Sequence, residues 1–164
     1  MKLIAEKLAL LEKYDRLHFV RADGTKTQCM MPRQGTLPHD LIHFVVETAL
    51  PLKHGFLSLV AAGADAVFVM KAVHDVANDE IETGAVQAEA LVEALQTQLW
   101  AGAFDSASFL HAASLAANSR GKPAFVFDRA DPVVLYENAL QLLDRWNEVS
   151  PYQCLELKFL AGEA

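Results

Sequence analysis

This chain of 164 residues is poor in cysteine, in basic side chains and in long apolar runs, and each shortage excludes a class of protein. Its two cysteines, Cys29 and Cys154, are too few and too far apart for a disulfide framework. The 14 basic side chains face 21 acidic ones, a net charge of −7 without a basic stripe, so nucleic acid is not an expected partner. The longest apolar stretch, residues 56–70, is broken by Ser58 and Asp65 and is too short to span a membrane.

Several motifs of common enzymes and metal-binding domains are missing as well. The chain contains no Gly-x-Gly-x-x-Gly, no Gly-x-x-x-x-Gly-Lys, no Gly-x-Ser-x-Gly and no Cys-x-x-Cys. These gaps remove the usual grounds for expecting a nucleotide-binding protein, an α/β-hydrolase, a zinc ribbon or a thioredoxin-like protein. No cationic start leads into an apolar run with a cleavage site, so we expect a cytoplasmic protein.

Apolar residues are plentiful by contrast. They make up 52% of the sequence, 26 residues are alanine, and the mean hydropathy is +0.17. We expect a single domain over residues 1–164, a size at which about 70% of the unfolded surface is buried on folding. Because surplus apolar surface is often covered by a second subunit, we also expect a homodimer.

The spacing of apolar residues predicts an α+β fold. Residues 16–31 alternate apolar and polar side chains on either side of Asp23-Gly24, a pair typical of tight turns, which predicts a β-hairpin. Residues 152–160 alternate in the same way and predict a closing strand, whereas residues 2–13 fit either a helix or a strand. We therefore predict a small antiparallel sheet, made of the N-terminal hairpin and the C-terminal strand, covered by about five helices.

Residues 37–47 concentrate more candidate chemistry than any other part of the sequence. They place His39, His43 and Glu47 four residues apart on one face of a predicted helix. Two imidazoles at this spacing can share one cation, so we predict a site for a divalent metal such as zinc with His39, His43 and Glu47 as candidate ligands. Because His39 and Glu47 lie about 12 Å apart along the helix axis, a real site would use one adjacent pair and ligands from elsewhere.

The same segment also has a purely structural interpretation. Its other residues are mostly apolar, so the helix is expected to be buried, and its histidines would then bond to the backbone or to each other. Asp40 stands where the zinc-protease motif His-Glu-x-x-His has its glutamate, and its shorter side chain does not safely take over the role of general base. Whichever interpretation holds, burying these polar groups without partners would cost several kcal/mol, so each must have one.

Two neighbouring features could complete a site. The loop of residues 33–36 leads directly into the histidine helix, where Arg33 and unpaired backbone N–H groups could bind a carboxylate or a phosphate. A second polar cluster, formed by His74, Asp75, Asp79 and Glu80, could supply a further ligand if the fold brings it near.

Two functions follow, and the sequence does not decide whether the protein is an enzyme. The first is a metal- or histidine-assisted hydrolysis or proton transfer on a small anionic molecule, with His43 and Glu47 as catalytic residues and Arg33 as the ligand-binding residue. The alternative is a non-catalytic, dimeric interaction or structural protein whose histidines are buried for structural reasons.

Overall fold

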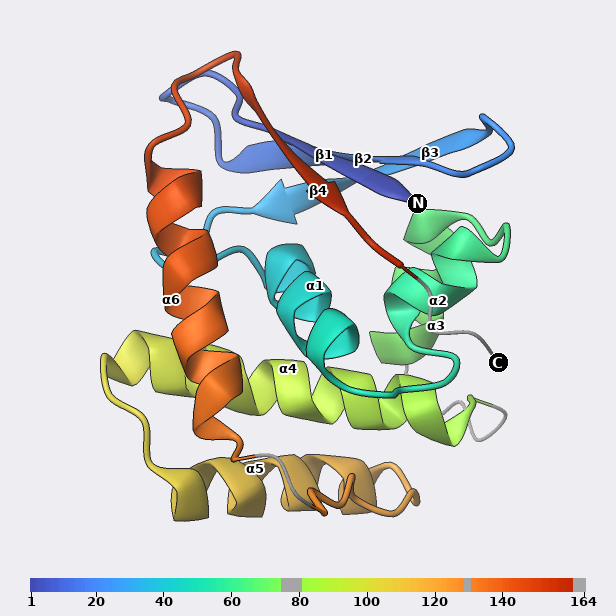
Figure 1. Cartoon of the computed structure of the whole chain (residues 1–164), viewed down its shortest axis with the longest axis vertical. Coiled ribbons are helices and arrows are strands. Elements are labelled where there is room, and N and C mark those ends of the chain that lie inside the picture. Colours follow the sequence, from blue (N-terminus) through green and yellow to red (C-terminus); the bar gives the residue numbers. More distant parts are fainter. Residues whose placement is uncertain (75–80, 129–130, 161–164) are drawn as a thin grey trace.

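The computed structural model describes residues 1–74, 81–128 and 131–160. Four strands form one antiparallel sheet in the order β3-β2-β1-β4. The strands are β1 (Lys2–Glu6), β2 (Tyr14–Val20), β3 (Lys26–Pro32) and β4 (Cys154–Lys158). The first and last strands of the chain are therefore neighbours at the centre and edge of the sheet, which ties the two ends of the fold together (Figure 1).

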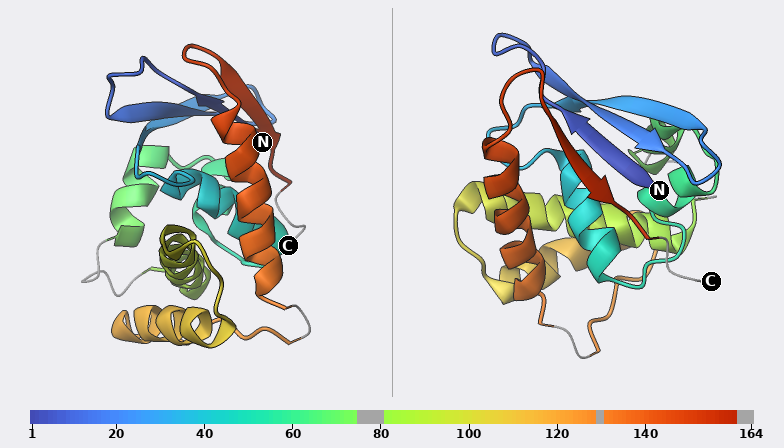
Figure 2. Two further views of the ribbon diagram at one scale, coloured as in Figure 1. Left: turned by 90° about the vertical axis from the view of Figure 1, so that its left-hand side faces the viewer. Right: turned by 45° about the horizontal axis from the view of Figure 1, so that its top comes forward.

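Helices cover one face of this sheet. They are α1 (His39–Ala49), α2 (Phe56–Ala61), α3 (Ala66–His74), α4 (Thr83–Ala101), α5 (Ser106–Ser119) and α6 (Val133–Asn147). Helix α1 lies directly beneath the sheet, α4 lies beneath α1, and α5 is outermost, while α6 runs alongside from the level of α5 towards the sheet (Figures 1 and 2). None of the described helices is long and apolar enough to cross a membrane.

Alternation along the strands decides which face the helices cover. Leu17 and Phe19 of β2 and Leu3 of β1 are fully buried against the helices. Their neighbours Arg16 and His18 point to the opposite face, as expected for a period of two residues. An antiparallel sheet with one apolar and one polar face accounts for the alternation of apolar and polar residues along the strands.

The structure confirms the predicted α+β fold. The hairpin is formed by β2 and β3 and turns at Gly24, whose φ of +84° favours glycine. The predicted closing strand is β4, and the undecided segment of residues 2–13 contributes strand β1.

Helix α1 begins at His39, after the N-cap residue Pro38, whose carbonyl accepts the N–H of Leu41 at 2.9 Å and so begins the hydrogen bonding of the helix. The helix is enclosed by the sheet, by α4 and by α6, and most of its residues are buried. Three of its polar residues, Asp40, His43 and Glu47, lie inside the protein, and His43 and Glu47 are only 3% and 6% exposed.

Candidate metal centre

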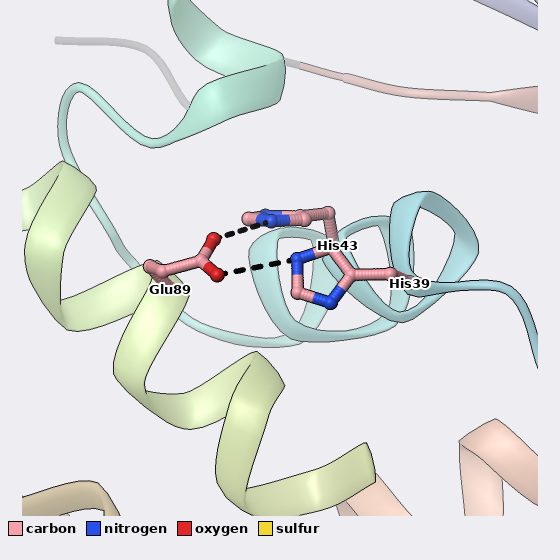
Figure 3. Close-up of side chains that lie close together, drawn as sticks. All are labelled: His39, His43 and Glu89. Carbon is pink, nitrogen blue, oxygen red and sulfur yellow. Dashed lines mark hydrogen bonds and ion pairs between the residues drawn. The ribbon is translucent and has the colours of Figure 1, made fainter. Parts of the chain in front are cut away.

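His39 and His43 lie side by side on one face of α1 and point at a single carboxylate, that of Glu89 on α4 (Figure 3). The centroids of the two imidazole rings are 5.0 Å apart. His43 Nε2 lies 3.1 Å from Glu89 Oε2, and His39 Nε2 lies 3.3 Å from Glu89 Oε1. One ligand atom from each of the three residues lies within 4.8 Å of the other two, so this group could hold a metal ion.

The dimensions of the group suit a small divalent ion. Bonds of 2.0–2.2 Å from zinc to histidine and carboxylate place neighbouring donors of a tetrahedral site about 3.4 Å apart. The two contacts with Glu89, at 3.1 and 3.3 Å, are close to that separation but involve different carboxylate oxygens, and the three ligand atoms lie within 4.8 Å of one another. Two imidazoles and one carboxylate are also a donor set found in zinc enzymes, where a fourth position stays open.

Glu47 lies on the other side of His43. Its Oε1 accepts from His43 Nδ1 at 3.0 Å, so it meets the ring nitrogen that does not face Glu89. Its carboxylate also accepts the backbone N–H of Leu57 at 3.0 and 3.2 Å, at the start of α2. A side chain at Gly55 would overlap this carboxylate, which explains why glycine stands there. Of the three ligands predicted from the sequence, the structure brings His39 and His43 together and places Glu47 behind His43.

The two carboxylates around His43 control its protonation. Burial alone would lower the pKa of His43, but the hydrogen bonds and charges of Glu47 and Glu89 outweigh burial and raise the pKa to about 10. Without a metal ion, His43 is therefore an imidazolium at neutral pH, held between two carboxylates. The position where a metal would bind Nε2 is taken by a proton, which a metal ion must displace.

Sequence reasoning missed Glu89, although a signal existed. Glu89 is only 1% exposed and lies between Ala88 and Ala90, within the buried part of α4. A lone carboxylate on the apolar face of a helix needs a partner, because burying it unpaired is costly. That signal marks Glu89 as unusual, but it does not reveal that the partners are His39 and His43, which lie about fifty residues earlier.

Arg33, the predicted ligand-binding residue, is engaged by the protein itself. Its guanidinium donates to both carboxylate oxygens of Asp15, at 2.6 and 3.0 Å, and to backbone oxygens of residues 8–10. It also lines a cavity of about 440 Å³ between its own loop and the end of α6, together with Lys7. An anionic ligand at Arg33 stays a prediction, and such a ligand would have to compete with Asp15.

The side chains of the second polar cluster lie outside the part of the chain that the structure describes. His74 ends α3, and Asp75, Asp79 and Glu80 lie outside the described residues.

No family of known proteins matches this chain, and comparisons with curated proteins and with solved structures found no relative.

Proposed function

We propose that this protein binds one divalent metal ion, with zinc the best match to the donors, through His39 Nε2, His43 Nε2 and the Glu89 carboxylate. The observation that supports the proposal most directly is that one buried carboxylate faces the Nε2 atoms of both imidazoles. Neutral imidazole and carboxylate are the ligands that zinc accepts alongside thiolate. Glu47 then has a supporting role, because a carboxylate on Nδ1 fixes the ring and strengthens Nε2 as a ligand.

An ion in this position would cross-link α1 to α4. These two helices form the middle of the helical layers, and His43 and Glu89 are 3% and 1% exposed. A bound ion would stabilise the folded chain, because the ligands are assembled only in the native state. Three protein donors leave one position of a tetrahedral ion for water or a small molecule. A catalytic role, in hydrolysis or proton transfer on a small anion, requires that the anion reach this fourth position of the ion. The route would pass His39, whose side chain is 13% exposed.

The competing function is a metal-free interaction protein, with the dimer as its working form. It is favoured by one specific observation: His43 has an oxygen partner at each ring nitrogen, Glu47 at Nδ1 and Glu89 at Nε2. Such a network satisfies a buried histidine without any ion. The two functions assign different roles to Glu89. It is a metal ligand in the first and the counter-ion of His43 in the second.

Elemental analysis of untagged protein, with melting measured in the presence and absence of a chelator, is the first test. We expect close to one metal ion per chain and a lower melting temperature in chelator. Less than about 0.1 ion per chain after incubation with zinc, together with unchanged melting, would leave only the metal-free function, since a bound ligand must stabilise the state that binds it.

A matched pair of variants on α4 sharpens this test. Glu89→Gln removes the shared carboxylate, whereas Glu93→Gln changes a glutamate one turn away that pairs with Arg120. We expect zinc binding to be lost in Glu89→Gln and kept in Glu93→Gln. His43→Ala should likewise lose zinc, whereas under the metal-free function both His43→Ala and Glu89→Gln change stability alone.

A further inference from the structure

A chain of amide groups leads from the protein surface to the ring of His39. His39 Nδ1 lies 3.4 Å from Oε1 of Gln96, a buried residue of α4. The amide nitrogen of Gln96 donates to Oε1 of Gln34, in the loop before α1. The indole N–H of Trp100, which is more than half exposed, donates to the backbone oxygen of Gln34 at 2.9 Å. The Nδ1 atom of His39 thus contacts a residue of α4, whereas the Nδ1 atom of His43 contacts Glu47 of its own helix.

The direction of the Gln96 amide matters because an amide has one accepting end and one donating end. Gln34 offers an oxygen, so it takes the donating nitrogen of Gln96 and leaves the accepting oxygen towards His39. Once a metal ion separates Nε2 from the Glu89 carboxylate, an oxygen acceptor at Nδ1 favours the form of imidazole that carries its proton there. The lone pair of His39 is then on Nε2, the atom that lies 3.3 Å from Glu89.

We propose that Gln96, oriented by Gln34, is a positioning residue that holds the His39 proton on Nδ1 and so makes Nε2 a metal ligand. This inference rests on the proposed function. Gln96 does for His39 what Glu47 does for His43, but with a neutral amide in place of a carboxylate. Because the acceptor is neutral, its bond to the imidazole is the weaker of the two. His39 is accordingly the ligand that the ion loses most readily.

The test compares the zinc and cobalt(II) affinities of wild-type protein and variants of α4. Gln96→Leu removes the acceptor, and we expect its affinity to fall about 10–100-fold, the range found when such an outer partner is lost. Gln96→Glu supplies a stronger acceptor and should bind at least as tightly as wild type. The control is Gln98→Leu, which removes a buried glutamine of the same helix whose amide oxygen accepts the N–H of Asp105 at 2.7 Å. It should leave affinity unchanged.

A second measurement separates positioning from a merely structural effect. In the cobalt-loaded protein, the N–H proton of each ligating imidazole has its own displaced resonance. We expect the His39 resonance to exchange faster with solvent in Gln96→Leu, while that of His43, bonded to Glu47, keeps its wild-type rate. If Gln96→Leu does not fold, Gln34→Leu replaces it, because it frees the Gln96 amide to turn and should weaken affinity by less than tenfold.

The outcomes distinguish this inference from the proposed function. Wild-type protein that binds neither zinc nor cobalt overturns both. Wild-type protein that binds while Gln96→Leu, or its replacement Gln34→Leu, binds equally well overturns only the role of Gln96. An equal loss of affinity in Gln96→Leu and Gln98→Leu does the same, because the effect would then come from the packing of α4.

Discussion

Two groups of polar side chains are each built around a buried carboxylate, Asp15 in one and Glu89 in the other, and they are held together in different ways. In the first, the Arg33 guanidinium meets both oxygens of Asp15 and several backbone oxygens. In the second, His39 and His43 meet the carboxylate of Glu89. A guanidinium in a protein keeps its protons and has no atom that could bind a metal ion, so we call the first group closed. An imidazole proton can be exchanged for a metal ion, so the second group can be a site.

The largest expected effect concerns pH and separates the two groups directly. His43 faces Glu47 on its own helix and Glu89 on α4, with the side chains of His39 and Asp40 nearby. Its pKa is raised to about 10 in the folded protein, against about 6.5 when unfolded. The folded state therefore binds the extra proton, and the stabilisation is complete below pH 6.5 and lost as the pH rises towards 10. We expect the metal-free protein to lose up to about 5 kcal/mol of unfolding free energy over this window.

Denaturant unfolding in chelator, at several pH values between 6 and 10, measures this loss. The control is His43→Gln, which cannot titrate and should show a much flatter pH dependence. Arg33 should contribute nothing to the slope, since its hydrogen bonds with Asp15 raise the pKa of Arg33 further above this window. A wild-type slope equal to that of His43→Gln would show that His43 is neutral in the folded protein.

Removing Asp15 tests the closed group. Asp15 is 1% exposed and also accepts the backbone N–H of Leu8 at 2.9 Å, so Asp15→Ala leaves Arg33 and Leu8 without their partner. We expect a loss of about 3 kcal/mol in unfolding free energy, the lower end for a broken buried pair, because Arg33 is partly exposed. Zinc affinity, measured by competition with a chromophoric chelator, should not change. Reduced zinc binding in a folded Asp15→Ala protein would contradict the separation of the two groups.

Replacing Glu47 tests whether it supports the centre or belongs to it. Glu47→Gln keeps the shape of the side chain but weakens the acceptor at His43 Nδ1. As a supporting residue, it should lower zinc affinity about 10–100-fold, or roughly 1.4–2.7 kcal/mol, with binding of one ion per chain retained. Isothermal titration of zinc gives both numbers. Complete loss of binding, equal to that of Glu89→Gln, would instead make Glu47 a ligand, as the sequence predicted.

Much of the fold was predictable because its signals are local. Asp23-Gly24 lies between two alternating segments, and that pattern depends only on the pleat of neighbouring strands. The cap of α5 is equally local, since the Asp105 carboxylate accepts the N–H of Ser108 at 2.7 Å. Residues 2–13 stayed undecided because the short apolar pattern of β1 also fits a helix. In the structure this segment is a strand that pairs with β4, from the opposite end of the chain, and such a distant pairing leaves no local signal in the sequence.

The candidate centre was predictable only along one helix. The spacing of His39 and His43 placed both rings on one face, and the structure brings them within 5.0 Å of each other. Helix periodicity carries no information about Glu89, because the approach of α4 to α1 is a matter of tertiary packing. Glu47 has the right spacing and still meets the other nitrogen of His43, since sequence spacing does not specify which ring nitrogen a neighbour will contact.

The smallest expected effect concerns the shape of the closed group. Arg33→Lys keeps the positive charge but cannot make two parallel contacts with Asp15. We expect it to cost about 1 kcal/mol of unfolding free energy. The matched change Arg16→Lys, at a half-buried pair with Glu6 that makes one guanidinium contact, should cost less than about 0.5 kcal/mol. Adding phosphate at constant ionic strength then checks the predicted anionic ligand. A rise in melting temperature for wild type that is absent in Arg33→Lys would show that the guanidinium leaves Asp15 for an anion, and the contrast between a closed group and an open one would fail.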